Sequence, residues 1–116
     1  MTTDLVSNWI NYYESQDMSS RWASDQLDQL VKDEPDRAFD LMVQIAEQSE
    51  DDFVVTNLGA GPFEDLLVLH GPEFIDAVEQ KVEQNPAFFR VVKCVLHHSI
   101  NDAVWKRVCE LQAKQL

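Results

Sequence analysis

Residues 85–96 read NPAFFRVVKCVL, a run that is apolar on almost every side once it is wound as a helix. Asn85 and Pro86 match a helix start, because asparagine caps a first turn and proline suits the first helical position. A helix that is apolar all round has to be covered by other elements on every side. We therefore expect residues 85–96 to form the central buried helix of the protein.

Proline and glycine mark helix boundaries on both sides of this segment. Helical spacing of apolar residues occurs along nearly the whole chain, and strand alternation is almost absent. The expected helices cover residues 4–14, 20–32, 35–49, 51–58, 62–70, 72–82, 85–96 and 102–114. The sequence predicts an all-α fold of seven or eight short helices, stacked as antiparallel helical hairpins in a short α-solenoid or an irregular bundle.

Three further helix boundaries are predicted from capping residues. Ser49 and Asp52 are spaced as a variant capping box, and Ser99 and Asp102 form a second capping pair. Gly59 is expected to close the helix before it in the left-handed conformation.

Length and composition indicate one domain over residues 1–116, since 116 residues with 45% hydrophobic content suit a single core. The N-terminus, MTTDLVSNWI, has no basic segment followed by an apolar stretch, so we expect a cytoplasmic protein. A formal net charge of −12 opposes binding to nucleic acid and to anionic membranes. Cys94 and Cys109 lie within apolar helical patterns, which favours buried free thiols.

The acidity is concentrated in the first half of the chain. Residues 1–58 carry 13 acidic and 3 basic side chains, a net charge of −10, whereas the remainder has a net charge of −2. Such clustering either keeps the protein soluble or accelerates capture of a basic partner. The candidate partner-binding residues are Asp25, Asp28, Asp36, Asp40, Glu50, Asp51 and Asp52, with an aromatic anchor among Trp9, Tyr12, Tyr13 and Trp22.

Residues 57–71 read NLGAGPFEDLLVLHG and form the most distinctive motif of the chain. Two glycines around one alanine favour a sharp turn between packed helices. The proline that follows suits the first position of the next helix, and two carboxylates come near that helix's positive end. The motif is therefore interpreted as a turn and helix cap built from Gly59, Gly61, Pro62, Glu64, Asp65 and His70.

The same stretch resembles the hallmark of a family of small uncharacterised bacterial proteins: Gly-Ala-Gly-Pro, then Leu or Phe, then Glu-Asp-Leu-Leu, and a downstream His-Gly. Phe63 occupies the apolar position here. The resemblance extends over most of the domain and includes Trp22 and Trp105. It implies a domain rather than an established reaction.

Catalysis is the least favoured function. Glu64, Asp65 and His70 are acid–base candidates, but helical residues six apart do not share a face and residues five apart share one poorly. His97 and His98 are adjacent and are expected to point in different directions, so no metal site is predicted. The sequence indicates no cofactor.

The favoured function is an acidic protein-binding module. Small size, the lack of a catalytic signature and the charge of the first half point to an immunity or inhibitor protein that neutralises a basic bacterial toxin, such as a nuclease, by occluding its site. A helical adaptor or self-associating scaffold is the alternative, and a small enzyme using Glu64 and His70 comes third. The oligomeric state stays open.

Overall fold

The computed structural model describes residues 4–114, which are helical with short connections and contain no strand. The elements are α1 (Leu5–Glu14), the 3-10 helix η1 (Met18–Ser20), α2 (Arg21–Asp33), α3 (Pro35–Gln48), α4 (Asp52–Leu58), the π-helical turn η2 (Gly59–Phe63), α5 (Glu64–Gln84), α6 (Pro86–Val92) and α7 (Asp102–Gln112). The all-α prediction is confirmed. Because η1 continues into α2, and α4 continues through η2 into α5, this range holds six separate helical runs rather than seven or eight.

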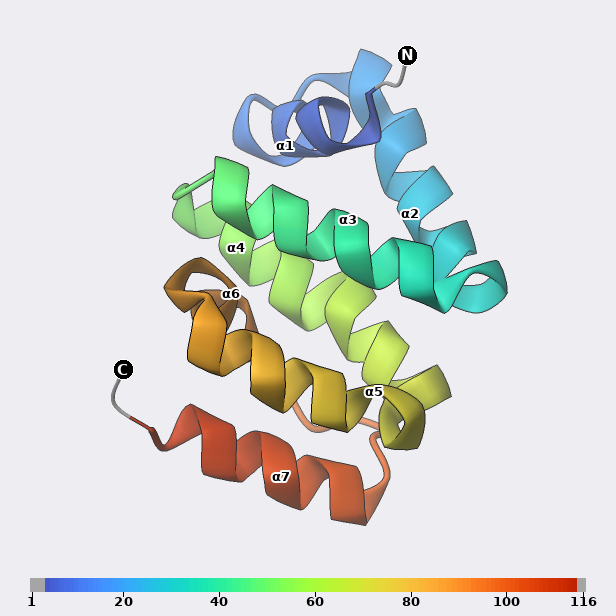
Figure 1. Cartoon of the computed structure of the whole chain (residues 1–116). Coiled ribbons are helices and arrows are strands. Elements are labelled where there is room, and N and C mark those ends of the chain that lie inside the picture. Colours follow the sequence, from blue (N-terminus) through green and yellow to red (C-terminus); the bar gives the residue numbers. More distant parts are fainter. Residues whose placement is uncertain (1–3, 115–116) are drawn as a thin grey trace.

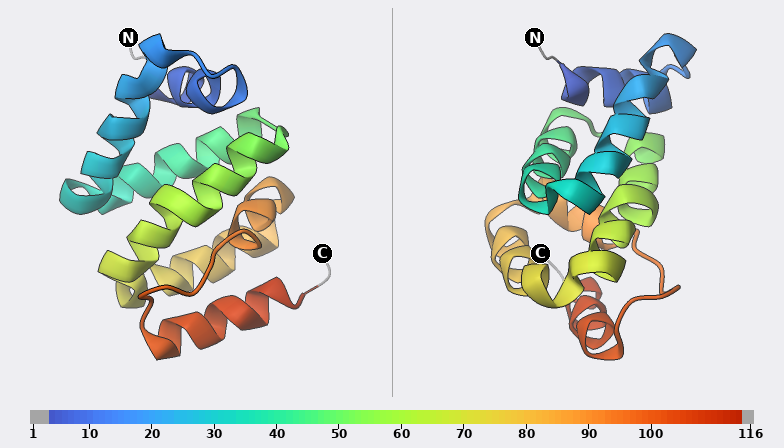
Figure 2. Two further views of the ribbon diagram at one scale, coloured as in Figure 1. Left: turned by 180° about the vertical axis from the view of Figure 1, so that it is seen from behind. Right: turned by 90° about the vertical axis from the view of Figure 1, so that its right-hand side faces the viewer.

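The helices are stacked roughly in the order of the sequence, from α1 at one end of the molecule to α7 at the other (Figure 1). α1, α2 and α3 pack on one another, and the run from α4 to α5 crosses behind α3, as the view from behind shows (Figure 2). α6 packs on α3 and α5, and α7 covers α5. No helix in residues 4–114 has the length and apolar character needed to cross a membrane.

One apolar cluster runs through these helices from α1 to α7, and α6 lies inside it. The Phe88 ring of α6 meets Phe39 of α3 edge-on at 5.5 Å between centroids and Phe63 of η2 at 5.3 Å. Val91 and Val92 of α6 are also fully buried. The predicted central buried helix is confirmed, although it ends at Val92 instead of reaching residue 96.

Of the three predicted N-caps, two are wrong and one is correct. Asn85 caps α6, its side chain accepting from an amide of the first turn. α4 is capped by Asp51 rather than Ser49, and α7 by Asn101 rather than Ser99. In both corrected cases the capping residue directly precedes the first helical residue, the position from which a short side chain reaches the free amides.

Several burial predictions also need correction. Trp9 is fully buried, so it cannot serve as an exposed anchor. Trp22 is 45% exposed, as an anchor has to be, because its neighbour Ala23 takes the core position. The cysteines are free thiols, but Cys109 is exposed and Cys94 is only half-buried. On α7 the adjacent Val108 faces the core, which turns Cys109 outward.

Candidate functional site

The Gly-Ala-Gly-Pro motif is a place of close helix packing and not a turn. Gly59 has a φ of −69°, which is right-handed, and Pro62 lies inside the π-helical turn η2 instead of starting a helix. A wider π turn accommodates a proline that has no N–H to donate. A Cβ on Gly59 would lie 2.4 Å from the carbonyl oxygen of Val91 and 2.7 Å from the Cβ of Cys94, so this glycine allows the long run to touch the end of α6. Gly61 has nothing within 4 Å of a Cβ.

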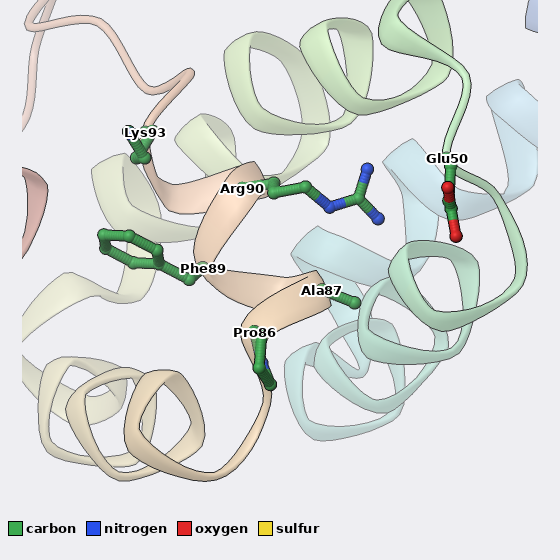
Figure 3. Close-up of a pocket in the computed structure, with 6 residues that line it drawn as sticks. All are labelled: Glu50, Pro86, Ala87, Phe89, Arg90 and Lys93. Carbon is green, nitrogen blue, oxygen red and sulfur yellow. The ribbon is translucent and has the colours of Figure 1, made fainter. Parts of the chain in front are cut away.

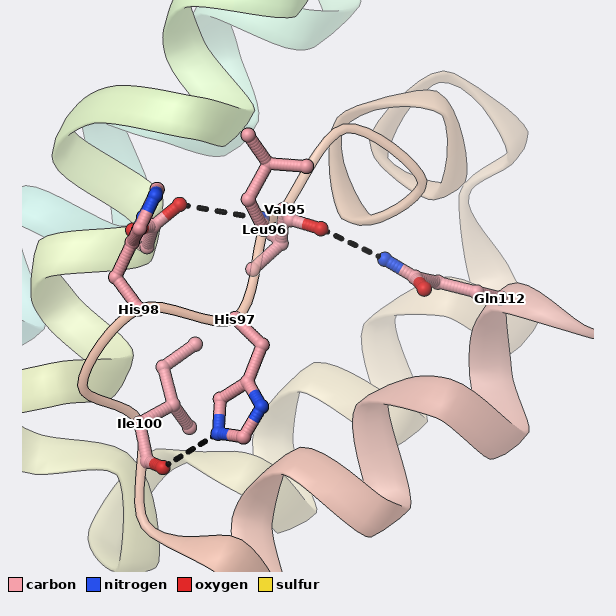
Figure 4. A network of polar contacts seen from close by, with 7 residues as sticks. Val95, Leu96, His97, His98, Ile100 and Gln112 are labelled. Atoms are coloured by element: carbon pink, nitrogen blue, oxygen red, sulfur yellow. Dashed lines mark hydrogen bonds and ion pairs between the residues drawn. The ribbon is translucent and has the colours of Figure 1, made fainter.

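Glu64 is the buried carboxylate of the motif, with 6% of its surface exposed. Its Oε1 accepts the backbone N–H of Leu96 at 3.1 Å, and its Oε2 lies 2.5 Å from Nδ1 of His98 (Figure 4). Glu64 therefore joins the start of α5 to the loop of residues 93–101 that leads from α6 to α7. The predicted helix cap is wrong, because α5 continues from η2 and has no side-chain cap at its start.

The same loop is held from the other side by α7. The side-chain amide of Gln112 donates to the carbonyl of Val92 at 3.0 Å. It also donates to the carbonyl of Val95 at 3.1 Å (Figure 4). The His97 ring stacks on Trp105 at 4.6 Å between centroids. His97 and His98 thus point in different directions, as the sequence predicts (Figure 4). Their contacts make the loop part of the packed structure.

His70 marks a bend in α5. Its φ of −136° is not helical, and helical geometry resumes at Gly71 and Pro72, close to the predicted helix start. The Nε2 of His70 lies 2.9 Å from the carbonyl oxygen of Val31, one of the free carbonyls in the last turn of α2. Glu64 and His70 therefore contact different neighbours, and the structure does not assemble them into an acid–base pair.

Asp65 lies with Asp28 in a groove between α2 and α5. The groove has a volume of about 300 Å³ and is lined by Asp28, Val31, Lys32, Asp65, Val68 and Leu69. Partial desolvation in the groove raises the pKa of Asp28, which keeps an exposed side, and the negative charges of Asp65 and Asp25 raise it further, while Lys32 opposes them. Burial and the charge of Glu64 likewise raise the pKa of Asp65. The fold thus brings Asp28, a predicted partner-binding residue, next to Asp65 of the motif. Their spacing in the sequence does not reveal this pairing.

The other predicted partner-binding acids lie elsewhere on the N-terminal helices. Asp36 and Asp40 are exposed one turn apart on α3. Glu50 and Asp52 are exposed at the connection from α3 to α4, and the half-buried Asp51 accepts from two backbone amides of α4. The acids therefore form three groups on successive elements: the α2 face toward α5, the α3 face, and the α3–α4 connection.

Glu50 also lines a basic pocket of about 520 Å³ with Pro86, Ala87, Phe89, Arg90 and Lys93 (Figure 3). The Arg90 guanidinium extends from α6 toward the α3–α4 connection and donates to the carbonyls of Ala46 and Ser49, both at 3.2 Å (Figure 3). Lys93 lies 5.4 Å from the centre of the Phe89 ring. This arginine satisfies free carbonyls at the C-terminal end of α3.

An exposed aromatic surface lies beside the α3–α4 connection. Met18 is 64% exposed and Phe53 is 55% exposed, and they line one groove with Tyr12 and Tyr13. The tyrosines were candidates from the sequence, whereas Met18 and Phe53 were not. The spacing of the buried residues of α4, at positions 54, 55 and 58, is a signal that places Phe53 on the opposite side.

Two further observations concern charge. Arg107 of α7 donates to Glu79 and to Asp76, which ties α7 to α5. Its guanidinium lowers the pKa of Glu79. Within residues 4–114 no three His, Cys, Asp or Glu side chains are grouped so as to hold a metal ion.

Fold and surface together define a small all-α protein, a stack of helices in which 13 of the 21 acidic side chains lie within residues 1–58. The chain belongs to a family of unknown function, DUF6869, whose model matches residues 11–116. Neither a curated protein nor a solved structure matches the chain.

Proposed function

We propose that this chain is an acidic protein-binding module that acts in the bacterial cytoplasm as an immunity or inhibitor protein, neutralising a basic toxin, such as a nuclease, by covering its active site. The observation that carries the proposal is the exposure of the carboxylates of the N-terminal half. Of the ten acids from Asp25 to Asp52, nine are exposed and Asp51 is half-buried. The free thiols Cys94 and Cys109 suit a reducing compartment.

These carboxylates have few internal partners. Among the described residues of α1–α4, one ion pair is present, between the exposed side chains of Arg21 and Asp25 at 3.9 Å. The C-terminal half differs, because Arg107 there is bound between two acids. Uncompensated charge of one sign produces a field that speeds the encounter with a basic partner. In a nuclease, such carboxylates would occupy the positions of substrate phosphates.

The proposal favours binding over catalysis. Glu64 is engaged by the 93–101 loop, and His70 by the end of α2, so the residues of the enzyme alternative are used in holding the fold together. A helical adaptor or self-associating scaffold is the second candidate, favoured by the exposed Met18 and Phe53. Sedimentation separates the two, because self-association would give an oligomer that is insensitive to salt.

The proposed function is tested by expressing each protein encoded next to this gene, alone and together with this chain. We expect one of them to be basic, to arrest growth alone, and to bind this chain with an association rate constant that falls as salt is added. If no neighbouring product is toxic, or if the toxic one does not bind, the inhibitor function is refuted.

A charge variant with a matched control sharpens this test. The test variant removes three carboxylates from the N-terminal half: Asp25→Asn, Asp36→Asn and Asp40→Asn. The control removes three exposed carboxylates from the C-terminal half: Glu83→Gln, Asp102→Asn and Glu110→Gln. We expect the test variant to lower the association rate constant about tenfold and the control to change it much less, because steering depends on where the charge lies. Equal effects would contradict the assignment of the acidic half as the docking side.

A further inference from the structure

The groove between the end of α1, the loop before η1 and the start of α4 is lined by Tyr12, Tyr13, Gln16, Met18 and Phe53. Its volume is about 290 Å³, enough for one large side chain rather than for a drug-sized ligand. Met18 and Phe53 are among the most exposed large apolar side chains of the described residues. Apolar groups gathered in this way at a surface are typical of an interaction site.

The groove is preformed. The ring of Tyr13 lies 4.2 Å from the fully buried Trp9, and its hydroxyl shares a hydrogen bond of 3.0 Å with Ser24 of α2. Tyr12 meets Tyr13 edge-on at 4.9 Å, and Phe53 lies 6.3 Å from Tyr13. A partner that binds these rings does not have to order Tyr13 first, which lowers the entropic cost of binding.

The charged residues that directly adjoin the lining residues in the sequence are all acidic. Each wall carries an exposed carboxylate next to a lining residue: Glu14 follows Tyr13, Asp17 precedes Met18, and Asp52 precedes Phe53. The sequence contains no lysine or arginine in residues 4–20 or 38–80, which supply all three walls. The negative faces of the rings and the nearby carboxylates therefore both favour a cation.

The acidic groove between α2 and α5 differs in this respect. Lys32 of this chain lines it and opposes the raised pKa values of Asp28 and Asp65. A cation is thus already present there, whereas none lines the aromatic groove. Of the two grooves, the aromatic one is the better receptor for a positive side chain from outside.

We propose that the aromatic groove formed by Tyr12, Tyr13, Gln16, Met18 and Phe53 receives an arginine side chain of the basic protein partner. A guanidinium is planar, stacks on aromatic rings and pairs with carboxylates, so it matches both features of the groove better than an ammonium does. This inference rests on the proposed function and names the contact at which the partner docks.

The probe is a short arginine-containing peptide, acetyl-Gly-Arg-Leu-Arg-Gly-amide, and its control is the same peptide with neutral citrulline in place of arginine. Binding is followed by amide chemical shifts of the full chain in NMR spectra. We expect the arginine peptide to shift amides of residues 12–18 and 52–54 and the citrulline peptide to lose this effect. Shifts confined to the α2–α5 groove, no shifts, or equal shifts with citrulline would overturn the proposal.

Variants of the lining residues complete the test. Phe53→Ala is expected to weaken peptide binding about tenfold, as truncation of an aromatic anchor does, without loss of helix content because the side chain is exposed. Leu96→Ala, an equally exposed apolar residue in the 93–101 loop, is expected to leave binding unchanged. If the toxic partner binds wild type and Phe53→Ala equally, the docking contact is wrong while the inhibitor function stands. If the peptide behaves as expected but no basic partner exists, the inhibitor function is refuted, while the groove is kept as a binding site for arginine side chains.

Discussion

Replacing Gly59 with alanine adds one methyl group where the run from α4 to α5 touches the end of α6. That Cβ would lie 2.4 Å from the carbonyl oxygen of Val91, about 1 Å less than the 3.4 Å at which ordinary contact begins. Its second neighbour, the Cβ of Cys94, is 2.7 Å away. Neither atom belongs to the end of a flexible side chain, so the clash is relieved only by moving the helices apart.

The magnitude follows from two opposing effects. Gly59 has helical φ and ψ, so alanine alone would stabilise the helix by up to ~1 kcal/mol. Overpacking in a core costs ~1–3 kcal/mol, and the upper part of that range applies because main-chain atoms have to shift. We expect Gly59→Ala to lower the free energy of unfolding by about 1–2 kcal/mol.

Gly61 and Gly71 provide matched controls. A Cβ on Gly61 meets nothing within 4 Å, so Gly61→Ala should raise the free energy of unfolding by ~0.5–1 kcal/mol. A Cβ on Gly71 would lie 3.1 Å and 3.2 Å from the two methyl groups of Val104, which can rotate or shift slightly, so its alanine variant should fall between the other two.

Urea unfolding followed by far-ultraviolet circular dichroism measures all three variants against the wild type. The expected order of stability is Gly61→Ala, then Gly71→Ala, then Gly59→Ala. A Gly59→Ala protein as stable as the Gly61→Ala protein would refute the close contact with α6, and with it our explanation of the motif.

Three further predictions concern charged side chains. Glu64→Ala should cost ~1–3 kcal/mol in urea unfolding, because it leaves a backbone amide of the 93–101 loop without its acceptor, while Glu64→Gln should cost less; equal losses would contradict that bond. Asp65→Asn should stabilise the protein by ~0.3 kcal/mol at neutral pH, because a carboxyl group with a raised pKa in the folded state destabilises the protein once it is ionised. The gain in stability should vanish below pH 3.8, the ordinary pKa of the group, where Asp65 is protonated in both the folded and the unfolded chain. Arg107→Met should lower the melting temperature by a few degrees at neutral pH. The difference from wild type should shrink as pH falls through the lowered pKa of Glu79, because the ion pair stabilises the fold only while Glu79 is ionised. A difference in melting temperature that is independent of pH would count against the ion pair.

The helical character of the chain and the place of α6 were predictable because both depend on local spacing. Apolar residues at helical intervals and the pair Asn85-Pro86 act within a few residues, so each segment carries its own signal. Capping was predicted less well. Ser49 and Asp51 are both competent capping residues, and the one that caps is decided by where the first helical residue falls, which depends on packing as well as on sequence.

The candidate site was predictable only in part. The net charge of the N-terminal half can be counted from the sequence, and the carboxylates that carry this charge are exposed, as a charged surface requires. The sequence did not indicate that Asp65 would lie beside Asp28, nor that Phe53 would join the tyrosines of α1 in one groove. These pairs are separated by more than 35 residues, and no alternation or spacing rule reaches that far.

The amino-acid sequence by itself determined the helical class of this protein, its charge and the identity of its most buried helix, because helix formation and net charge depend on residue type and near neighbours. Only the tertiary structure decided that Gly59 and Pro62 lie within a continuous helical run, and that Glu64 holds a loop 32 residues away. A glycine at the contact between two packed helices can have the same neighbours in sequence as a glycine in a turn. What distinguishes them is whether another part of the chain occupies the space that a side chain would fill.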